Sequence, residues 1–219
     1  MRVVIAGGHG QIALRLTKLM TGDGHEVVGL VRNPDHEADV AAAGGQAAVL
    51  DLERVDVAAV AGVLAGADVA IFAAGAGPGS GNARKDTVDR GAAALFAHAA
   101  EQAGVRRHIQ VGSMGADGAD ALTDDETFTV YLKAKWAAEE DLRSRDLDWT
   151  ILRPGGLTNE AGTGLVRLAD KTGNGSVSRD NVALVLAGLC DTPAAIGRTL
   201  ELIAGDTPVA EALKSLKIL

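Results

Sequence analysis

The chain has 219 residues, a formal net charge of −8 at pH 7 and one cysteine, a length that suits one domain with a buried core. The acidic balance argues against non-specific binding to nucleic acid or to a membrane surface, and the lone Cys190 excludes an intrachain disulfide. No apolar run is long enough to span a bilayer, and Met1 leads into a strand without a signal-peptide pattern, so we expect a cytoplasmic protein.

The chain opens with a strand, a glycine turn and a helix. The β-branched run Val3–Ala6 ends in glycines, and an apolar-periodic segment follows at Gln11–Thr21. Glycine lets a phosphate approach the backbone closely, and the next helix directs its free N–H groups at that anion. The turn therefore predicts a bound dinucleotide. The residues expected to contact it are Gly7, Gly8, His9, Gly10, Gln11 and Ile12.

Two overlapping spacings occur in this turn. Gly8-x-Gly10-x-x-Ala13 fits the dinucleotide fingerprint, with alanine at the third place, and Gly7-x-x-Gly10-x-x-Ala13 is a second glycine spacing. A glycine turn that joins a strand and a helix without any ligand is the alternative interpretation.

Short apolar strands alternate with helical patterns almost to the end of the chain. The expected strands are Val3–Ala6, Glu26–Val31, Gln46–Leu50, Val69–Ala74, His108–Gly112, Trp149–Arg153 and Thr199–Ile203. The expected helices are Gln11–Thr21, Pro34–Ala43, Val57–Leu64, Arg84–Ala103, Tyr131–Arg145, Arg179–Leu189 and Val209–Leu216. This alternation predicts an α/β fold with a doubly wound, mostly parallel sheet of the Rossmann type and helices on both faces.

We expect one domain over residues 1–219, in which residues 155–178 and the C-terminal segment form a small lobe on the substrate side. The glycine-rich stretches 74–81 and 155–175 predict loops. Both stretches follow strand ends, so both would lie on the cofactor edge of the sheet.

The ends of the second and third strands bear on the choice of cofactor. Arg32 and Asn33 follow the second strand, where NAD-preferring folds carry an acid. A guanidinium matches a 2′-phosphate, so Arg32 predicts a preference for NADP(H) over NAD(H). Asp51 and Leu52 end the third strand beside the expected adenine. A solvated Arg32 and a turn-forming Asp51 are the alternatives.

Several motifs occur in an order that resembles a known family. They are the glycine turn, Val31-Arg32-Asn33-Pro34, Leu50-Asp51-Leu52, Val111-Gly112-Ser113, Trp149–Gly155, Ser178–Ala183 and Gly205–Pro208. Together they resemble the atypical short-chain dehydrogenase/reductase (SDR) proteins of the NAD(P)H-binding group. That group includes NADPH-dependent flavin and biliverdin reductases, epimerase-like proteins and catalytically silent redox sensors. The resemblance covers nearly the whole chain and implies a fold and a cofactor more than a reaction.

The resemblance also implies a catalytic triad. SDR enzymes use a serine after a strand, and then a tyrosine and a lysine four residues apart; here these would be Ser113, Tyr131 and Lys135. Ser113 would hold the substrate carbonyl and Tyr131 would donate a proton, while the Lys135 ammonium would favour ionisation of the phenol and hydrogen-bond the nicotinamide ribose. Tyr131 falls at the start of its expected helix, so a ring that is merely packed there is the alternative.

Other residues are expected near the cofactor or in structural roles. Small residues after the fourth strand and residues after the sixth would border it: Ala73, Ala74, Gly75, Pro154, Gly155 and Leu157. Arg84, Lys85 and Asp86 are further candidates for phosphate or substrate contact. We expect Arg153 to pair with an acid and Glu139–Asp141 to form a solvated helix face. No His, Cys, Asp or Glu spacing predicts a metal site.

The leading functional hypothesis is an NADPH-dependent oxidoreductase that acts on a small carbonyl, quinone or flavin-type substrate. One alternative is a non-catalytic NADP(H)-binding redox sensor. Another is a sugar-nucleotide epimerase or dehydratase, which normally needs more chain after Pro154. We expect a small-molecule substrate, no nucleic-acid or membrane partner, and either a monomer or a homodimer formed through residues 84–103 and 131–145.

Overall fold

The computed structural model of the protein describes residues 1–77, 84–119 and 125–217. Nine strands form one sheet in the order β11-β8-β10-β6-β5-β4-β1-β2-β3. The parallel strands are β1 (Arg2–Ala6), β2 (Glu26–Val31), β3 (Gln46–Val49), β4 (Val69–Phe72), β5 (Arg107–Val111), β6 (Asp148–Pro154) and β10 (Arg198–Ala204). The strand order reverses at β1, the point at which doubly wound folds bind their ligands.

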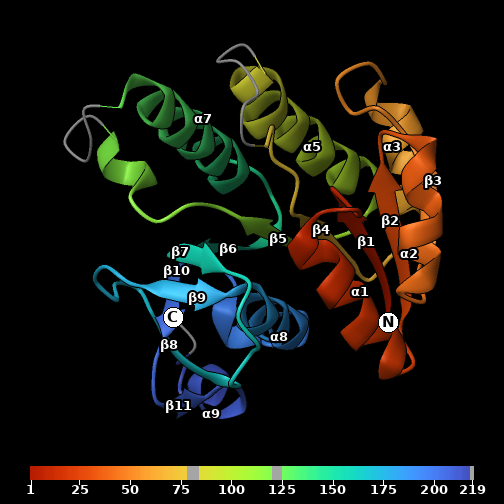
Figure 1. Cartoon of the computed structure of the whole chain (residues 1–219). Coiled ribbons are helices and arrows are strands. Elements are labelled where there is room, and N and C mark those ends of the chain that lie inside the picture. The colour runs from red at the N-terminus through yellow and green to blue at the C-terminus, as the bar shows by residue number, and fades with distance from the viewer. Residues whose placement is uncertain (78–83, 120–124, 218–219) are drawn as a thin grey trace.

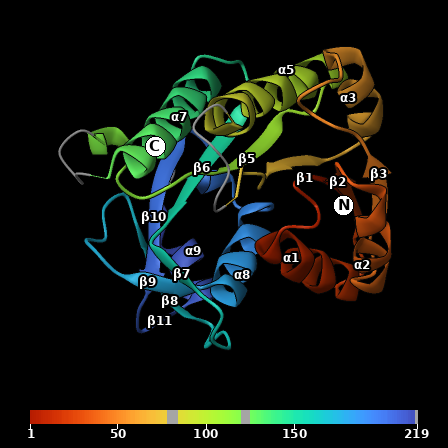
Figure 2. The ribbon, with the colours of Figure 1, turned by 45° about the horizontal axis from the view of Figure 1, so that its top comes forward.

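Helices cover both faces of this sheet. Figure 2 shows one layer on each side of the strands. One layer holds α1 (Gln11–Gly22), α8 (Arg179–Leu189) and α9 (Val209–Lys214), and the other holds α3 (Val57–Leu64), α5 (Ala93–Ala103) and α7 (Glu126–Arg143). A π-helical segment, η2 (Lys85–Ala92), runs directly into α5, and α2 (Glu37–Ala42) lies beside β3. The predicted doubly wound α/β fold is confirmed.

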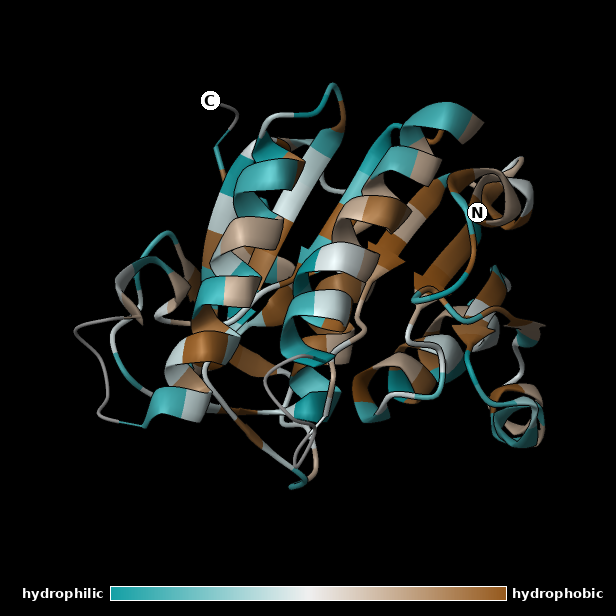
Figure 3. Ribbon diagram, turned by 90° about the horizontal axis from the view of Figure 1, so that it is seen from above, coloured by the Kyte–Doolittle hydropathy of each residue, from teal (hydrophilic) through white to brown (hydrophobic). Residues whose placement is uncertain are grey.

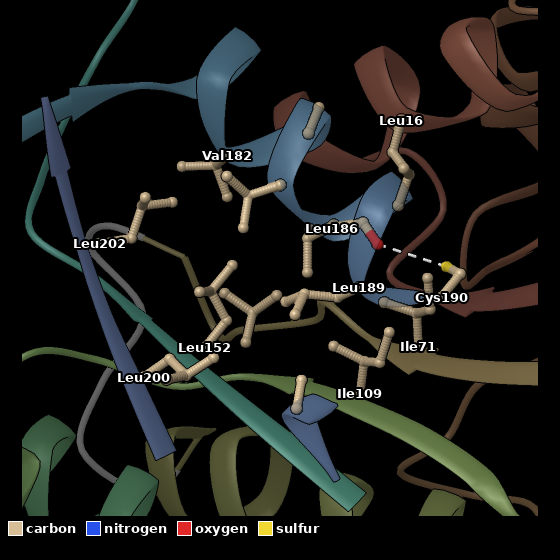
Figure 4. Close-up of a cluster of buried hydrophobic side chains, with 14 of the residues drawn as sticks. Leu16, Ile71, Ile109, Leu152, Val182, Leu186, Leu189, Cys190, Leu200 and Leu202 are labelled. Atoms are coloured by element: carbon tan, nitrogen blue, oxygen red, sulfur yellow. Dashed lines mark hydrogen bonds between the residues drawn. The ribbon is translucent and has the colours of Figure 1, made fainter. Parts of the chain in front are cut away.

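Two aliphatic clusters form the core, one on each side of the sheet. In Figure 4, Val182, Leu186 and Leu189 of α8 point at the strand residues Ile109 and Leu152. Figure 3 shows hydrophobic colour concentrated on the strands and hydrophilic colour on the outer faces of the helices. Burying these aliphatic side chains supplies most of the driving force for folding.

Cys190 lies at the edge of this core as a buried free thiol. It is 7% exposed, and its Sγ donates to the backbone oxygen of Leu186 at 3.3 Å (Figure 4). Burial raises the pKa of the thiol to about 12, although nearby Arg107 acts in the opposite direction. Cys190 is therefore an inert packing residue at neutral pH.

The predicted loop at 155–175 is wrong in part, because this stretch contains strands. β7 (Gly156–Thr158) pairs with β9 (Ser176–Ser178) in a small parallel sheet of their own. β8 (Leu165–Ala169) joins the main sheet antiparallel to β10, and β11 (Thr207–Pro208) pairs with β8. Figure 1 shows these strands in the lower part of the view, beside α8 and α9. Val166 and Leu168 of β8 are buried and alternate with exposed residues, because the strand faces the core on one side only.

Two further expectations concern element boundaries. The helix expected from Tyr131 begins five residues earlier, at Glu126, because the Asp125 carboxylate accepts hydrogen bonds from the amides of Thr127 and Phe128. The loop predicted at 74–81 is described only to Gly77, and its remaining residues lie outside the described part of the chain. Within the described residues, no helix is both long enough and apolar enough to cross a membrane.

Candidate functional site

The glycine turn after β1 packs tightly between its neighbouring strands. Gly7 has φ +80°, and a Cβ on it would lie 2.7 Å from the Cα of Ala74. A Cβ on Gly8 would lie 2.5 Å from the Cα of Gly29, and the Gly8 amide donates to Leu30 at 2.8 Å. Neither position accepts a side chain, so the turn exposes bare backbone at the carboxyl edge of the sheet.

This turn fits the pyrophosphate of a dinucleotide. Gly10 is the N-cap of α1 and provides no side chain to accept hydrogen bonds from the first amides of the helix. The positive end of the helix dipole is therefore available to an anion above the glycine backbone. Gln11 and Ile12 begin the helix at this point, as the sequence predicts.

His9 and Asn33 make structural contacts next to the turn. The Nε2 of His9 lies 2.7 Å from Oδ2 of Asp39, and its ring stacks on His36 with the centroids 3.6 Å apart. The Asn33 side chain accepts from the Asp35 amide at 3.1 Å and caps the short helical turn that follows β2. These contacts account for both side chains without a cofactor, so their roles in binding stay predictions.

A first cavity, which we call the Arg32 cavity, has a volume of about 190 Å³ and lies beyond the ends of β2, β3 and β4. The residues of the sequence prediction that line it are Gly7, Arg32, Asp51, Leu52, Ala74 and Gly75. Asp51 also accepts from the Glu53 amide at 3.1 Å and lies 3.5 Å from Arg54, so it forms the turn that was its alternative role.

Glu53, which sequence reasoning missed, organises the charges of the Arg32 cavity. Its Oε2 accepts from Arg84 at 2.8 Å and from Arg32 at 3.3 Å, and its Oε1 accepts from the Thr87 hydroxyl at 2.7 Å. These hydrogen bonds, that of Thr87 foremost, hold the pKa of the Glu53 carboxyl below its usual value. Two guanidinium groups therefore converge on one carboxylate at the wall of this cavity.

A second cavity, which we call the Lys135 cavity, also has a volume of about 190 Å³ and lies beyond the ends of β4, β5 and β6. It brings together the three residues of the expected catalytic triad with most of the residues expected near the nicotinamide. Those lining it are Ile12, Ala73, Ala74, Gly75, Ser113, Tyr131, Lys135, Pro154, Gly155 and Leu157. The two cavities share Ala74 and Gly75, as one extended ligand would require.

Tyr131 and Lys135 lie one turn apart on α7. Because α7 begins at Glu126, Tyr131 is in its second turn rather than at its frayed end, and its ring is half-buried. The Lys135 Nζ lies 5.8 Å from the centre of that ring and donates to the backbone oxygens of Ala74 at 3.3 Å and Val111 at 3.4 Å. The lysine thus ties α7 to the ends of β4 and β5.

Asp89 on η2 is the buried partner of this lysine. Its side chain has no exposed surface, and its Oδ1 lies 3.2 Å from the Lys135 Nζ. Burial disfavours the charged lysine, but the nearby Tyr131 and Asp89 outweigh that effect and raise the pKa of Lys135 above its usual value. Lys135 therefore stays an ammonium at neutral pH. No sequence spacing indicated Asp89, because the ion pair joins residues 46 positions apart.

The remaining charged candidates, Arg84, Lys85 and Asp86, lie at the start of η2 and make different contacts. Of these three residues, Arg84 lines the Arg32 cavity, whereas Lys85 and Asp86 do not line it. The Lys85 Nζ donates to the Thr127 backbone at 2.8 Å, and Asp86 pairs with Arg90. Within the described residues, no group of three or more His, Cys, Asp or Glu side chains could hold a metal ion.

Arg153 pairs with acids, as expected, but one of its partners is a surprise. Its Nη2 lies 2.6 Å from Oε2 of Glu139, and its Nη1 lies 2.9 Å from Asp117. Glu139 is fully buried, so the expectation of a solvated face at Glu139–Asp141 is wrong for this residue. A Cβ on Gly112 would collide with that carboxylate, which explains the glycine before Ser113.

Comparisons with known proteins identify the family to which the chain belongs. The protein YhfK of Bacillus subtilis, named as an uncharacterised sugar epimerase, is 37% identical over 217 residues, covering 99% of this chain and all of that one. A Bacillus halodurans structure, provisionally assigned as an NAD-dependent epimerase/dehydratase, has a TM-score of 0.92 at 34% identity and covers 99% of this chain and 100% of its own. The anaerobilin reductase ChuY of Escherichia coli O157:H7 has a TM-score of 0.80 at 27% identity, covering 93% and 97%. A family model described as NAD(P)H-binding matches residues 7–193. The chain belongs to this NAD(P)H-binding family, whose members are oxidoreductase-like and epimerase-like proteins.

Proposed function

We propose that the protein is an NADPH-dependent reductase of a small carbonyl, quinone or flavin-type molecule. The observation that carries this proposal is that Ser113, Tyr131 and Lys135 line one cavity at the same sheet edge as the glycine turn. A dinucleotide whose pyrophosphate rests on that turn would have one end in the Arg32 cavity and the other in the Lys135 cavity.

The chain's own residues have the chemistry that carbonyl reduction requires. Bound NADPH would supply a hydride. The Ser113 hydroxyl would donate a hydrogen bond to the substrate oxygen, and the Tyr131 hydroxyl would give that oxygen its proton. The buried ammonium of Lys135 would favour the phenolate that Tyr131 becomes, because the opposite charge lies on the next turn of the same helix. Solvent would then reprotonate the phenolate.

Turnover tests the proposed reaction. Purified protein is mixed with NADPH and a panel of aldehydes, quinones and flavins, and NADPH oxidation is followed by absorbance. We expect turnover with members of the panel, and we expect Tyr131→Phe to lower kcat for a carbonyl or quinone by roughly 10²-fold, the usual contribution of a proton donor. Direct hydride transfer to a flavin would not need the phenol and would survive this change. Absence of turnover on the whole panel, with NADPH binding intact, would refute the enzyme and favour a redox sensor.

The convergence of Arg32 and Arg84 supports a preference for NADPH over NADH. A 2′-phosphate would meet two guanidinium groups at the wall of the Arg32 cavity, whereas an unmodified ribose would offer them only hydroxyls. We expect titration to show that NADPH binds with a lower Kd than NADH. Arg32→Ala and Arg84→Ala should each reduce the ratio of the two Kd values by roughly tenfold, the value of one charged hydrogen bond. Arg54→Ala is the control, because that side chain is 84% exposed. Equal affinities in the wild type would overturn this preference.

An epimerase acting on a sugar nucleotide is the second candidate, since the Bacillus subtilis relative carries that name. Such a reaction oxidises and then reduces its substrate, so it consumes no cofactor overall. Incubation with UDP-glucose and NAD, followed by analysis of the sugar, distinguishes it from the reductase. We expect no change in the sugar.

A further inference from the structure

A third cavity adjoins the Lys135 cavity on the side away from the glycine turn. This chamber, which we call the Phe128 cavity, has a volume of about 460 Å³ and shares Ser113, Tyr131 and Leu157 with the Lys135 cavity. A molecule in it would meet the serine and tyrosine hydroxyls at one wall. Its position makes it the place where a substrate would lie, if the reductase function proposed above is correct.

The walls of the Phe128 cavity are flat and apolar. Phe128 and Leu157 line it and are 40% and 39% exposed, two of the few large hydrophobic side chains left open to solvent. The Phe128 and Tyr131 rings are 5.9 Å apart at an angle of 26°, so their faces are nearly parallel. Exposed apolar surface around a concave site marks a place where a ligand is bound, and aromatic faces favour a planar ligand.

The Phe128 cavity offers no positive charge. Among the described residues that line it, none carries a charged side chain. The basic residues nearby are already paired: Lys171 lies 3.0 Å from both Asp117 and Glu201, and Arg153 lies 2.9 Å from Asp117. The stretches 78–83 and 120–124, which the structure leaves undescribed, contain no Lys, Arg or His in their sequence.

An anionic substrate would therefore lose water here without gaining a cation. Removing a carboxylate or a phosphate from water costs several kcal/mol unless an opposite charge replaces the water. A sugar nucleotide carries a diphosphate and would meet this cost for each charged oxygen that the cavity removes from water. An uncharged molecule would not.

We propose that the substrate is an uncharged, planar carbonyl compound of the quinone class, bound between the Phe128–Tyr131 rings and Leu157. This inference rests on the proposed reductase function. The quinone would take a hydride from NADPH and a proton from the Tyr131 hydroxyl, and a second proton from solvent would restore the phenol. The products are the quinol and NADP⁺, so two electrons and two hydrogens are accounted for.

A matched pair of quinones tests the inference. The compounds are 1,2-naphthoquinone and its 4-sulfonate, which share the reacting carbonyls and the ring but differ by one fixed negative charge. We expect kcat/KM to be at least tenfold higher for the neutral quinone, although the sulfonate makes the ring the better electron acceptor.

A positive charge placed on the cavity wall should weaken this preference for the neutral quinone. Asn174 lines the Phe128 cavity but neither the Arg32 cavity nor the Lys135 cavity, and it is exposed, so an arginine can be accommodated there. We expect Asn174→Arg to raise kcat/KM for the sulfonate relative to the neutral quinone by at least tenfold, and the control Asn174→Gln to leave that ratio unchanged.

The outcomes separate the two proposals. Equal kcat/KM values for the two quinones, or a wild-type preference for the sulfonate, would overturn the inference while the reductase stands. Failure of Asn174→Arg to change the ratio would overturn the assignment of the substrate to this cavity. No NADPH oxidation with either quinone or with the wider panel would overturn both.

Discussion

Replacing Asp89 with asparagine tests whether the ion pair beneath the site holds it together. Asp89→Asn keeps the shape of the side chain but removes the charge that faces Lys135 Nζ at 3.2 Å. The two side chains are 0% and 6% exposed, so little water can replace the lost partner. The other oxygen of Asp89 accepts a hydrogen bond from the Ala76 amide at 3.3 Å. This hydrogen bond is a second contact that Asp89→Asn can keep or lose.

The burial of both groups determines the size of the effect. Leaving one charge of a buried pair unpartnered costs about 3–5 kcal/mol of unfolding free energy. We therefore expect Asp89→Asn and Lys135→Met each to lower the free energy of unfolding by about 3 kcal/mol at pH 7. The double variant removes both charges, so its loss should fall short of the sum of the two single losses by about 2 kcal/mol or more.

The pH dependence gives an independent check. Folding raises the pKa of Lys135, so its contribution to stability is complete below the unfolded value of 10.5 and is lost as the pH rises through the folded value. The difference in stability between wild type and Asp89→Asn should hold constant up to about pH 9 and shrink above pH 10.5. Urea unfolding, followed by the fluorescence of Trp136 and Trp149, measures both quantities. If the two single losses add up to the loss of the double variant within about 0.5 kcal/mol, the reasoning is refuted.

Two more outcomes are expected. Burial, with repulsion from Arg107 and Arg145, lowers the pKa of His108 from 6.5 to about 3. Between pH 7 and pH 4 the free energy of unfolding of the wild type should therefore fall by about 3 kcal/mol relative to that of His108→Leu. A difference in urea unfolding that does not change with pH would count against this. Gly8→Ala would place a Cβ 2.5 Å from the Gly29 backbone. It should lower the free energy of unfolding by about 1–3 kcal/mol and weaken NADPH binding in a titration. Gly22→Ala, with no atom within 4 Å of its added Cβ, is the control, and equal effects of the two substitutions would contradict the argument.

Local pattern predicts most of the sheet but not its C-terminal edge. The parallel strands are short segments rich in apolar residues that alternate with helical patterns, so their type and parallel arrangement follow from the sequence. β8 was missed because its pattern of exposed and buried residues, Leu165–Ala169, is short and lies among glycines. Its antiparallel partner β10 begins 29 residues beyond its end, and no local signal reports such a pairing.

The start of α7 was missed for a different reason. Its first turn, Glu126–Thr129, carries polar residues and no apolar periodicity, so the helix pattern becomes visible only near Tyr131. The signal that could have located it is Asp125, a preferred N-cap residue directly before the true start.

The site residues also form two groups, those expected from the sequence and those that depend on contacts made by the fold. Ser113, Tyr131 and Lys135 were expected from the resemblance to SDR proteins, and the structure places all three around one cavity. Glu53, Asp89 and the burial of Glu139 depend on contacts across the sheet with Arg84, Lys135 and Arg153. Nothing in the sequence near an acid says which distant cation will neutralise it.

The distribution of charge along the sheet edge supports the proposed reductase over an epimerase. Arg32 and Arg84 both pair with Glu53, so two guanidinium groups lie at the wall where the 2′-phosphate of NADPH would bind in the proposed complex. At the other end, Arg153 and Lys171 are paired with neighbouring carboxylates, and the Phe128 cavity keeps no cation among its described lining residues. A sugar nucleotide needs positive charge at both ends, for the cofactor and for its own diphosphate, whereas an uncharged quinone needs it only at the first. Because related folds share the cofactor site and differ in what lies beyond it, the uncharged chamber carries more weight for the reaction than the glycine turn does.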